Sequence, residues 1–315
     1  MSLPTHFTFN NGLKIPAVGL GCWMGEPGHS EDCYEMCIKG LKMGYRHLDT
    51  WCALGNEEAV GRAVRDSGIP REEIFVTTKL AWKHHGSVAE ALDISLKDLG
   101  MDYVDLYLMH WPQAADPKTG EYLQPDEYPT YVETWKAMEA LLSTGKVKSI
   151  GVSNFSIKTL EVLLPQAKVV PVTNQVEAHP ALPWVELLEY CKSKGILITA
   201  YSPLGRNPNF FIEKSPELKA LLESEGLSPS QAVISWAVQR GTVPIPKSVN
   251  ESRLKNNLSV VKLSDKVMGI LDNFHKIPGV HGTLIFPEPA EGKVAGWTFD
   301  QLGWGMDEKG KVISS

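Results

Sequence analysis

Short apolar runs alternate with helical patterns along almost the whole chain, and this alternation constrains the fold more than any other feature. The expected strands cover 17–21, 46–49, 74–79, 104–110, 149–153, 172–176, 196–201 and 242–246. The expected helices cover 30–43, 56–67, 87–99, 131–143, 183–194 and 250–257, with two more starting near 156 and 228. Strands that alternate with helices form parallel sheets, and eight such units close into a barrel. We therefore predict an α/β fold, a (β/α)8 TIM barrel.

Two segments lie outside this repeat. Alternating residues on both sides of Asn11-Gly12 predict an N-terminal β-hairpin. From about residue 277 the chain is rich in glycine, proline and aromatic residues and has no clear periodicity, a pattern typical of functional loops. Its aromatic residues Phe286, Trp297, Phe299 and Trp304 predict that this segment packs over another part of the protein. No compositional break divides the chain, so we predict a single domain over residues 1–315.

Composition excludes several classes of function. The chain is 43% hydrophobic and 22% charged, which is ordinary for a globular protein and excludes pervasive disorder. A net charge of -6 argues against nucleic acid as the main partner. No apolar run is long enough to predict a membrane span, and the N-terminus lacks the pattern of a signal peptide. We therefore expect a cytoplasmic protein.

Cysteine and histidine spacing predicts no metal site and no disulfide framework. The five cysteines are Cys22, Cys33, Cys37, Cys52 and Cys191. Cys33 and Cys37 lie four residues apart on an expected helix, where buried thiols are the favoured interpretation. His84, His85 and His179 lack companions at metal-ligand spacing, so we expect solvated or loop histidines there.

Polar and aromatic residues follow the expected strands at the carboxyl ends, where barrel enzymes have their active sites. These residues are Trp23, Asp49, Lys79, His110, Ser153, Asn154, Gln175, Tyr201 and Lys247. Each alone has an ordinary interpretation, such as a solvated lysine at a strand end or a core imidazole. Together they predict a site in which Asp49 and Lys79 form a buried ion pair, which would change the proton affinity of a neighbouring group. His110 could then orient and polarise a carbonyl oxygen.

Two candidate motifs, a dinucleotide-binding turn and a nucleophile elbow, are not supported by the residues around them. The glycines of 19–21 suggest a dinucleotide turn, but the third glycine is Gly25 and no helix follows at once. Ser153 does not stand in a Gly-x-Ser-x-Gly sequence, so it is not a nucleophile elbow.

A third motif is more informative. Lys247 and Arg253 bracket an expected helix start, where free backbone donors favour an anion. A charged helix start and a phosphate site both explain the pattern. The guanidinium would favour a 2′-phosphate over a plain ribose.

The ordered motifs resemble those of the aldo-keto reductase family over nearly the full chain. The matching segments include Gly12-Leu13-Lys14-Ile15-Pro16, His47-Leu48-Asp49-Thr50, Gly55-Asn56-Glu57, Thr78-Lys79-Leu80, Met109-His110-Trp111-Pro112, Gly151-Val152-Ser153-Asn154-Phe155, Asn174-Gln175-Val176-Glu177, Ala200-Tyr201-Ser202-Pro203-Leu204-Gly205 and Ile245-Pro246-Lys247-Ser248. Within the family the chain is similar to fungal xylose-reductase-like and aldehyde reductase members. The resemblance implies a (β/α)8 barrel that binds NADPH and reduces aldehydes, ketones or aldoses by hydride transfer.

The resemblance also implies roles for individual residues. The implied cofactor contacts are Trp23, Thr50, Ser153, Asn154, Gln175, Tyr201, Ser202, Leu204, Lys247, Ser248, Asn250, Arg253, Asn256 and Asn257. Among them Tyr201 would stack under the nicotinamide, and Arg253 would belong to the clamp for the 2′-phosphate. Asn256 stands where many relatives carry glutamate, so use of NADH stays open. Trp23 and Trp111 would form walls of the substrate pocket, with the tail as the third wall.

The family's catalytic set is an aspartate, a tyrosine, a lysine and a histidine. Asp49, Lys79 and His110 match three of these positions. Leu54 stands at the tyrosine position, and the register is fixed by the Gly55-Asn56-Glu57 that follows it. The family's tyrosine donates a proton to the carbonyl oxygen, and leucine has no proton to donate.

Leu54 leaves four interpretations open. The chain could be a working NADPH-dependent reductase in which His110, Lys79 or a water that they hold donates the proton. It could reduce an iminium group, which arrives already protonated. The leucine could instead have been selected or engineered to silence a reductase, or the barrel could be a nucleotide-binding module without turnover. We favour a reductase acting on a small-molecule carbonyl or imine, as a monomer or homodimer, because a binding module has no evident need for Asp49, Lys79 and His110 together.

Overall fold

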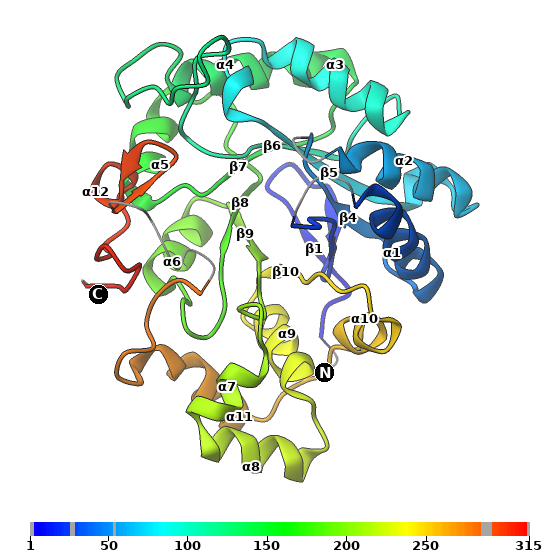
Figure 1. Ribbon diagram of the computed structural model, residues 1–315, viewed down its shortest axis with the longest axis vertical. Helices are drawn as coiled ribbons and strands as arrows, with labels where there is room; N and C mark the ends of the chain where they lie inside the picture. Colours follow the sequence, from blue (N-terminus) through cyan, green and yellow to red (C-terminus); the bar gives the residue numbers. More distant parts are fainter. Residues whose placement is uncertain (1–2, 26–28, 53–54, 285–291, 314–315) are drawn as a thin grey trace.

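The structure is a computed structural model that describes residues 3–25, 29–52, 55–284 and 292–313. Among these residues, eight parallel strands form the central sheet in the order β10-β9-β8-β7-β6-β5-β4-β3 (Figure 1). The strands are β3 Leu20–Gly21, β4 His47–Asp49, β5 Phe75–Leu80, β6 Leu106–Met109, β7 Ile150–Ser153, β8 Thr173–Glu177, β9 Leu197–Tyr201 and β10 Val243–Ile245. The (β/α)8 prediction is confirmed.

Backbone hydrogen bonds close the sheet into a barrel. The amide of Gly19 donates to the carbonyl of Pro244 at 3.0 Å, and that of Gly21 donates to Pro246 at 3.1 Å. A Cβ atom on Gly21 would lie 2.9 Å from the carbonyl oxygen of Ile245. Only glycine therefore allows the first barrel strand to approach the last one so closely.

Helices surround the strands (Figure 1). Those that follow the strands are α1 Ser30–Met43, α2 Asn56–Asp66, α3 Val88–Leu99, α4 Tyr131–Leu141, α5 Ile157–Leu163, α6 Val185–Ser193, α9 Pro229–Gln239 and α10 Glu251–Leu258. Each predicted helix lies within a few residues of its expected range. In the described part of the chain no helix is long and apolar enough to cross a bilayer.

Helix starts follow local sequence rules. The Ser228 hydroxyl accepts a hydrogen bond from the amide of Gln231 at 3.2 Å, and Pro229 occupies the first turn of α9. A serine cap followed by proline satisfies donors that a helix start leaves free.

Besides α12 of the tail (Phe299–Leu302), the described residues contain three helices outside the repeat that were not predicted. They are α7 Asn209–Lys214, α8 Pro216–Glu225 and α11 Asp265–Asp272. Leu218, Val267 and Leu271 pack with Trp236 of α9 in a separate buried cluster. The helix expected over 250–257 was predicted to be the last of the chain, but α11 follows it.

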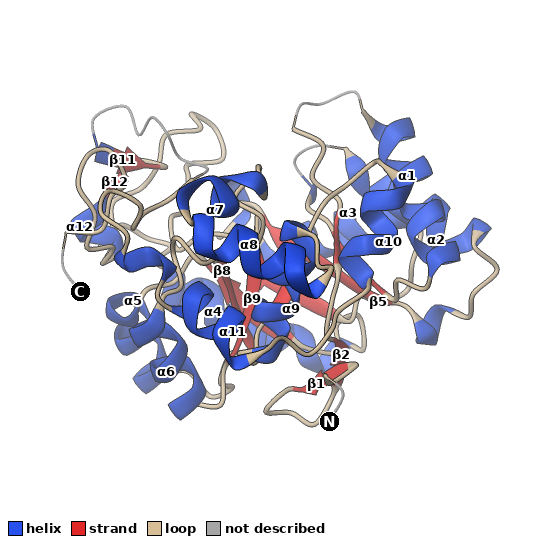
Figure 2. Cartoon of the chain, turned by 90° about the horizontal axis from the view of Figure 1, so that it is seen from below, coloured by secondary structure: helices blue, strands red, loops and turns tan. Residues whose placement is uncertain are grey.

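The predicted N-terminal hairpin is also present. Strands β1 (His6–Thr8) and β2 (Lys14–Pro16) are antiparallel, with Phe7 opposite Ile15. Phe9 and Ile15 pack against Leu108 and Val243 of the barrel strands. Figure 2 shows the hairpin below the central strands, with β11 and β12 above them. The hairpin thus covers one end of the barrel and leaves the carboxyl ends of the strands for a site.

The C-terminal tail has more structure than its sequence suggested. It contains the antiparallel pair β11 (Lys293–Val294) and β12 (Trp297–Thr298), followed by α12 (Phe299–Leu302). The indole of Trp297 donates to the carbonyl of Leu123 at 2.7 Å, and the Gln113 amide donates to Val294 at 2.8 Å. The tail therefore packs on the long loop after β6, whereas Phe286 lies outside the described residues.

Candidate active site

An acid and a lysine meet at the carboxyl ends of two neighbouring strands. Asp49 ends β4 and is paired in register with Thr77 of β5. Lys79 lies two residues further along β5, so its side chain points to the same face as that of Thr77. Both side chains are about 5% exposed, and the Lys79 ammonium donates to the Asp49 carboxylate. The predicted buried ion pair is present.

Both oxygens of the Asp49 carboxylate have partners. The second oxygen accepts a hydrogen bond from the amide nitrogen of Gln175 at 2.7 Å. The Lys79 ammonium also donates to the carbonyl oxygen of Thr50 at 2.9 Å. Gln175 was expected only as a cofactor contact, and its bond to Asp49 was not predicted. A buried ion pair with further hydrogen bonds of this kind holds both charges in fixed positions.

Polar residues from three more strands extend this arrangement. The Ser153 hydroxyl donates to the carbonyl of Gln175 at 2.7 Å. The Asn154 amide donates to the carbonyl of His110 at 3.0 Å and accepts from the Tyr201 hydroxyl at 2.8 Å. Burial raises the pKa of Tyr201 well above its ordinary value, so its hydroxyl stays protonated as a donor. These bonds tie the ends of β6, β7, β8 and β9 together.

Aromatic rings surround His110. Its ring centroid lies 4.5 Å from that of Trp51 and 6.2 Å from that of Trp111, and Trp82 stacks on it at 6.4 Å. This enclosure lowers the pKa of His110 well below its usual value, and the Lys79 ammonium lowers it further. The imidazole is therefore neutral at physiological pH. Its Nδ1 atom is buried and has no partner among the described residues, which leaves Nε2 to meet a ligand.

Trp51 was not among the residues predicted for the site. Its indole nitrogen is buried without a hydrogen-bond partner in the described part of the chain, and its ring also lies 5.6 Å from that of Trp82. Both tryptophans follow strand ends, two residues after Asp49 and Leu80 respectively. That position could have identified them. Leu54 lies outside the described residues.

The expected walls of the substrate pocket have different environments. Trp23 follows β3 and is 52% exposed, with the Arg206 guanidinium 6.0 Å from its ring centroid. Trp111 is buried, and its ring lies 5.9 Å from that of Trp304 in the tail. A tail aromatic residue thus reaches Trp111, as a third wall requires.

The start of α10 presents two cations to solvent. Lys247 and Arg253 are exposed, and neither forms an ion pair within the described ranges. Asn250 caps the helix by accepting from the Arg253 amide at 3.1 Å. The Ser248 hydroxyl accepts from the Asn250 amide at 3.2 Å. A helix start with unpaired cations favours an anion.

The next turn of α10 carries the two remaining asparagines. The Asn256 amide nitrogen donates to the hydroxyls of Ser228 and Ser230 at 2.6 and 3.1 Å. Its hydrogen-bonding capacity is thus partly used within the protein. Asn257 is buried, and its side-chain oxygen has no partner among the described residues.

The other expected cofactor contacts lie at the ends of β4 and β9. The hydroxyl of Thr50 is buried without a partner among the residues that the structure describes. Ser202 has a left-handed backbone with φ of 47°, and Leu204 is half-buried in the same turn. The fourteen expected cofactor residues therefore lie at strand ends or near the start of α10, from β3 around to β10.

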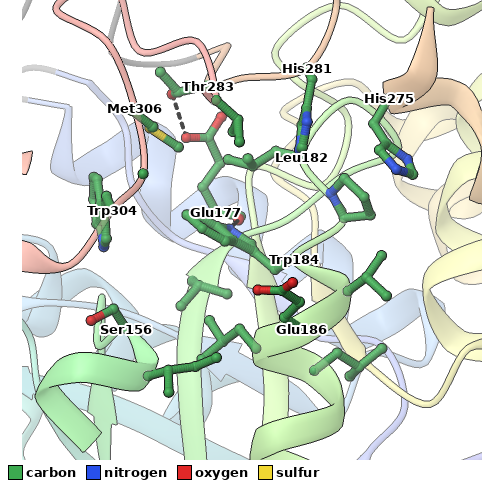
Figure 3. A pocket seen from close by; sticks show the side chains of 18 of the residues that line it. Ser156, Glu177, Leu182, Trp184, Glu186, His275, His281, Thr283, Trp304 and Met306 are labelled. Atoms are coloured by element: carbon green, nitrogen blue, oxygen red, sulfur yellow. Dashed lines mark hydrogen bonds between the residues drawn. The ribbon is translucent and has the colours of Figure 1, made fainter. Parts of the chain in front are cut away.

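A cavity of about 740 Å³ opens beside these residues (Figure 3). Asn154 and Tyr201 line it on the barrel side, and Trp304 and Met306 line it from the tail. Asp49, Lys79 and His110 are not among its lining residues, so the cavity meets the expected cofactor residues only at Asn154 and Tyr201 and does not contain the ion pair.

A buried carboxylate fixes the tail at this cavity. Glu177 at the end of β8 accepts a hydrogen bond from the Thr283 hydroxyl at 2.5 Å (Figure 3). It also accepts one from the backbone amide of Leu284 at 2.9 Å. The ring of His179 lies 2.8 Å from the same carboxylate. His179 and His85 were expected to be solvated or loop histidines; both lie outside the helices and barrel strands, but both are buried, so the expectation of solvation was wrong. His179 is paired with Glu177, which stands two residues before it, and His85 lies 3.2 Å from the hydroxyl of Thr134.

Comparison with known proteins adds to this geometry. The model of the Aldo/keto reductase family matches residues 17–276. Glycerol 2-dehydrogenase (NADP(+)) of Saccharomyces cerevisiae is 44% identical over 291 residues, which cover 86% of this chain and 91% of that protein. D-galacturonate reductase of Hypocrea jecorina is 42% identical over 286 residues, covering 86% of this chain and 90% of that protein. The solved structure of Bombyx mori aldo-keto reductase AKR2E4 in complex with NADP has a TM-score of 0.78 and 33% identity, and covers 89% of this chain and 95% of that chain. The chain therefore belongs to the aldo/keto reductase family.

Proposed function

We propose that this protein is an NADPH-dependent reductase of small-molecule carbonyl compounds. The observation that carries the proposal is the buried Lys79–Asp49 pair beside a neutral His110 at the carboxyl end of the barrel. Such a set can hold a carbonyl oxygen and stabilise the negative charge that develops on it.

The residues at the barrel mouth fit a dinucleotide phosphate. Lys247 and Arg253 offer charge to a phosphate without first breaking an ion pair with the described residues. Gln175 uses its amide nitrogen on Asp49, which leaves its side-chain oxygen to accept from a carboxamide. Tyr201 would support the nicotinamide ring. NADPH supplies hydride when it is bound. Relatives whose names include NADP support this choice, and NADH would be the weaker alternative because it lacks the 2′-phosphate.

The protein's own groups then act on the carbonyl oxygen. The neutral His110 ring donates a hydrogen bond through Nε2, which orients the carbonyl. The Lys79 ammonium, fixed by Asp49, stabilises negative charge on the oxygen. We propose that the Lys79 ammonium, or a water that Lys79 and His110 hold, provides the proton that Leu54 cannot provide; the neutral His110 ring, considered above as another donor, orients the carbonyl instead.

The substrate class follows from the site and from the named relatives. Relatives of this chain include a glycerol dehydrogenase, a galacturonate reductase and a D/L-glyceraldehyde reductase. Trp23 and Trp111 supply apolar walls beside the polar set. We therefore propose small hydroxylated aldehydes and ketones as the first substrates to test.

A second candidate function is the reduction of iminium compounds. Leu54 offers no proton, and an iminium group needs none at its nitrogen. The faces and edges of Trp51 and Trp82 gather around His110. Aromatic rings attract cations, which supports a positively charged substrate.

A substrate panel tests both candidates. Purified protein would be assayed with aldehydes, hydroxyketones and cyclic imines while NADPH absorbance is followed. Turnover of carbonyl compounds above that of imines supports the first proposal, and the reverse result supports the second. Saturable NADPH binding without turnover on any compound would contradict both and would indicate a binding module.

The Leu54→Tyr variant tests whether position 54 limits the reaction. A positioned general acid typically contributes about 10²- to 10⁴-fold, so aldehyde turnover should rise by that order. Leu54→Phe is the matched control, since it adds the ring without the hydroxyl. Equal turnover in both variants and in the unmodified protein would show that Leu54 does not limit catalysis.

A further inference from the structure

Three thiols meet behind the first barrel strand. Cys22 follows β3, and Cys33 and Cys37 lie on α1. All three are buried, with exposed fractions of 1%, 0% and 0%. Their sulfur atoms all lie within 4.8 Å of one another, and those of Cys22 and Cys37 are 3.6 Å apart. The reductase reaction proposed above makes no use of them.

Local structure fixes this arrangement. Cys33 and Cys37 are four residues apart, which places them on one face of α1. Both backbone groups of Cys22 form hydrogen bonds. Its amide donates to the backbone carbonyl of Asp49 at 2.8 Å, and its carbonyl accepts from the side chain of Asn56 at 2.9 Å. The remaining contacts of the thiols are weak. Cys22 donates to the carbonyl of Leu20 at 3.5 Å, and Cys33 donates to that of Cys22 at 3.7 Å. The three sulfur atoms are therefore positioned before any ligand arrives.

The spacing distinguishes between two uses of such a cluster. A disulfide would require two sulfur atoms to close from 3.6 Å to about 2.05 Å within a packed core. With metal–sulfur bonds of about 2.3 Å, three sulfur atoms around one ion in a plane stand about 4.0 Å apart. The Cys22–Cys37 separation is 3.6 Å and no pair exceeds 4.8 Å, so both figures lie within 1 Å of that value. Binding an ion requires smaller movements than forming a disulfide.

The ligand set also selects the ion. Thiolates favour soft ions such as Cu(I), Zn(II) or iron–sulfur clusters. Structural zinc sites have four ligands, and no fourth His, Cys, Asp or Glu joins these three in the part of the chain that the structure describes. Cu(I) accepts three sulfur ligands. We propose that Cys22, Cys33 and Cys37 form a buried three-sulfur site for one Cu(I) ion.

Charge and proton balance agree with this site. Each sulfur forms a bond to copper and releases its proton to solvent, and no electron is transferred. The Lys247 ammonium interacts favourably with negative charge at Cys33 and offsets part of the charge of three thiolates. Lys247 also belongs to the proposed phosphate site, and Trp23 directly follows Cys22. A bound ion would therefore connect α1 to the segment that carries Trp23.

A competition titration tests the proposal. The full-length, reduced protein would be titrated anaerobically with Cu(I) in the presence of bicinchoninate, a coloured Cu(I) chelator. One equivalent of copper should be withheld from the chelator, with sulfur-to-copper charge-transfer absorption in the ultraviolet. Cys22→Ser, Cys33→Ser and Cys37→Ser should each lose that equivalent. Cys191→Ser removes a buried thiol of α6 and should keep it.

Three results would overturn the proposal. One is a triple serine variant that withholds copper as well as the unmodified protein does. Another is a loss of thiols that persists after the copper has been removed with a chelator from the unfolded protein, which would indicate a disulfide. If the serine variants do not fold, X-ray absorption on the copper-loaded unmodified protein decides the question. Three sulfur neighbours support the site, and oxygen or nitrogen neighbours contradict it.

Discussion

The two ends of the candidate site differ in where their counter-charges come from. At the acid end, Asp49 and Lys79 are buried, and both carboxylate oxygens have protein partners. At the clamp end, Lys247 and Arg253 are exposed and have no partner of opposite charge among the described residues. The protein therefore fixes the geometry of the acid end by itself, whereas a ligand must supply the negative charge at the clamp end. Substitutions at the acid end should affect turnover and the unfolding free energy, and substitutions at the clamp end should affect the affinity for NADPH.

The largest expected effect is at the acid end. Asp49→Asn keeps the hydrogen bond from Gln175 but leaves the Lys79 charge buried without its partner. Losing one member of a buried pair costs about 3–5 kcal/mol of unfolding free energy. Turnover should fall by about 10²- to 10⁴-fold, the range for losing a positioned proton-transfer group. Denaturant unfolding and steady-state kinetics measure the two effects.

The matched control for that variant is Asp300→Asn. Asp300 forms a surface ion pair with Lys158 at 3.7 Å, and its side chain is exposed. Turnover and stability should not change. If Asp49→Asn behaves in the same way as this control, the acid end does not have the fixed charges that the comparison assumes.

Low pH should lower the unfolding free energy of the protein through a histidine next to the acid end. His47 lies in β4, two residues before Asp49, and burial lowers its pKa from 6.5 to about 4. The unfolded chain therefore binds a proton between those values and the folded protein does not, so the unfolding free energy falls as pH drops below about 6.5. The difference between the folded and unfolded pKa of His47 lowers the unfolding free energy by about 3 kcal/mol near pH 4. His47→Gln should remove this part of the acid sensitivity in urea titrations at several pH values.

Other buried histidines contribute to the acid response, so the test compares variants rather than absolute curves. His6→Gln changes an exposed imidazole and serves as the control. Equal slopes of stability against pH for the two variants would show that His47 is not the responsible group.

A smaller effect is expected at the clamp end. Arg253→Ala should raise the KM for NADPH by about 10- to 100-fold, because a charge-assisted hydrogen bond contributes about 1.5–3 kcal/mol. The KM for NADH should stay the same, since it lacks the 2′-phosphate. Lys255→Ala removes an exposed cation from the same helix and should change neither value. Equal increases for both cofactors would place the 2′-phosphate elsewhere.

The smallest expected effect concerns the aromatic enclosure of the acid end. Trp51→Phe shortens the ring that contacts His110 and should lower kcat/KM for the carbonyl substrate by about 2- to 10-fold, the range for one aromatic contact. The KM for NADPH is the internal control and should stay constant. A change in that value with no change in substrate kinetics would place Trp51 beside the cofactor.

The fold could be predicted because buried parallel strands form continuous apolar runs, which stand out between helices. Asp49, Lys79 and His110 could be found for a related reason, since barrel strands end at one common edge. The α8 and α11 helices were missed because they add to the repeat instead of continuing it.

Apart from the Lys79–Asp49 pair, contacts between distant segments were not predicted. The bond from Gln175 to Asp49 depends on the curvature of the barrel, which no local pattern encodes. Cys22 joins Cys33 and Cys37 only when α1 packs behind β3. The burial of His179 was missed because its partner Glu177 had been assigned no role, and no local pattern shows that this carboxylate is buried.

The bonds from Gly19 and Gly21 to Pro244 and Pro246 have a consequence for synthesis of the chain. A ribosome makes β3 early and β10 near the end, so β3 waits with an open edge while the intervening strands emerge. An open strand edge can pair with another chain. Contacts between distant segments also form slowly. The open edge of β3 in the nascent protein is therefore covered only when β10 has been made. The segment that covers it leads directly into Lys247.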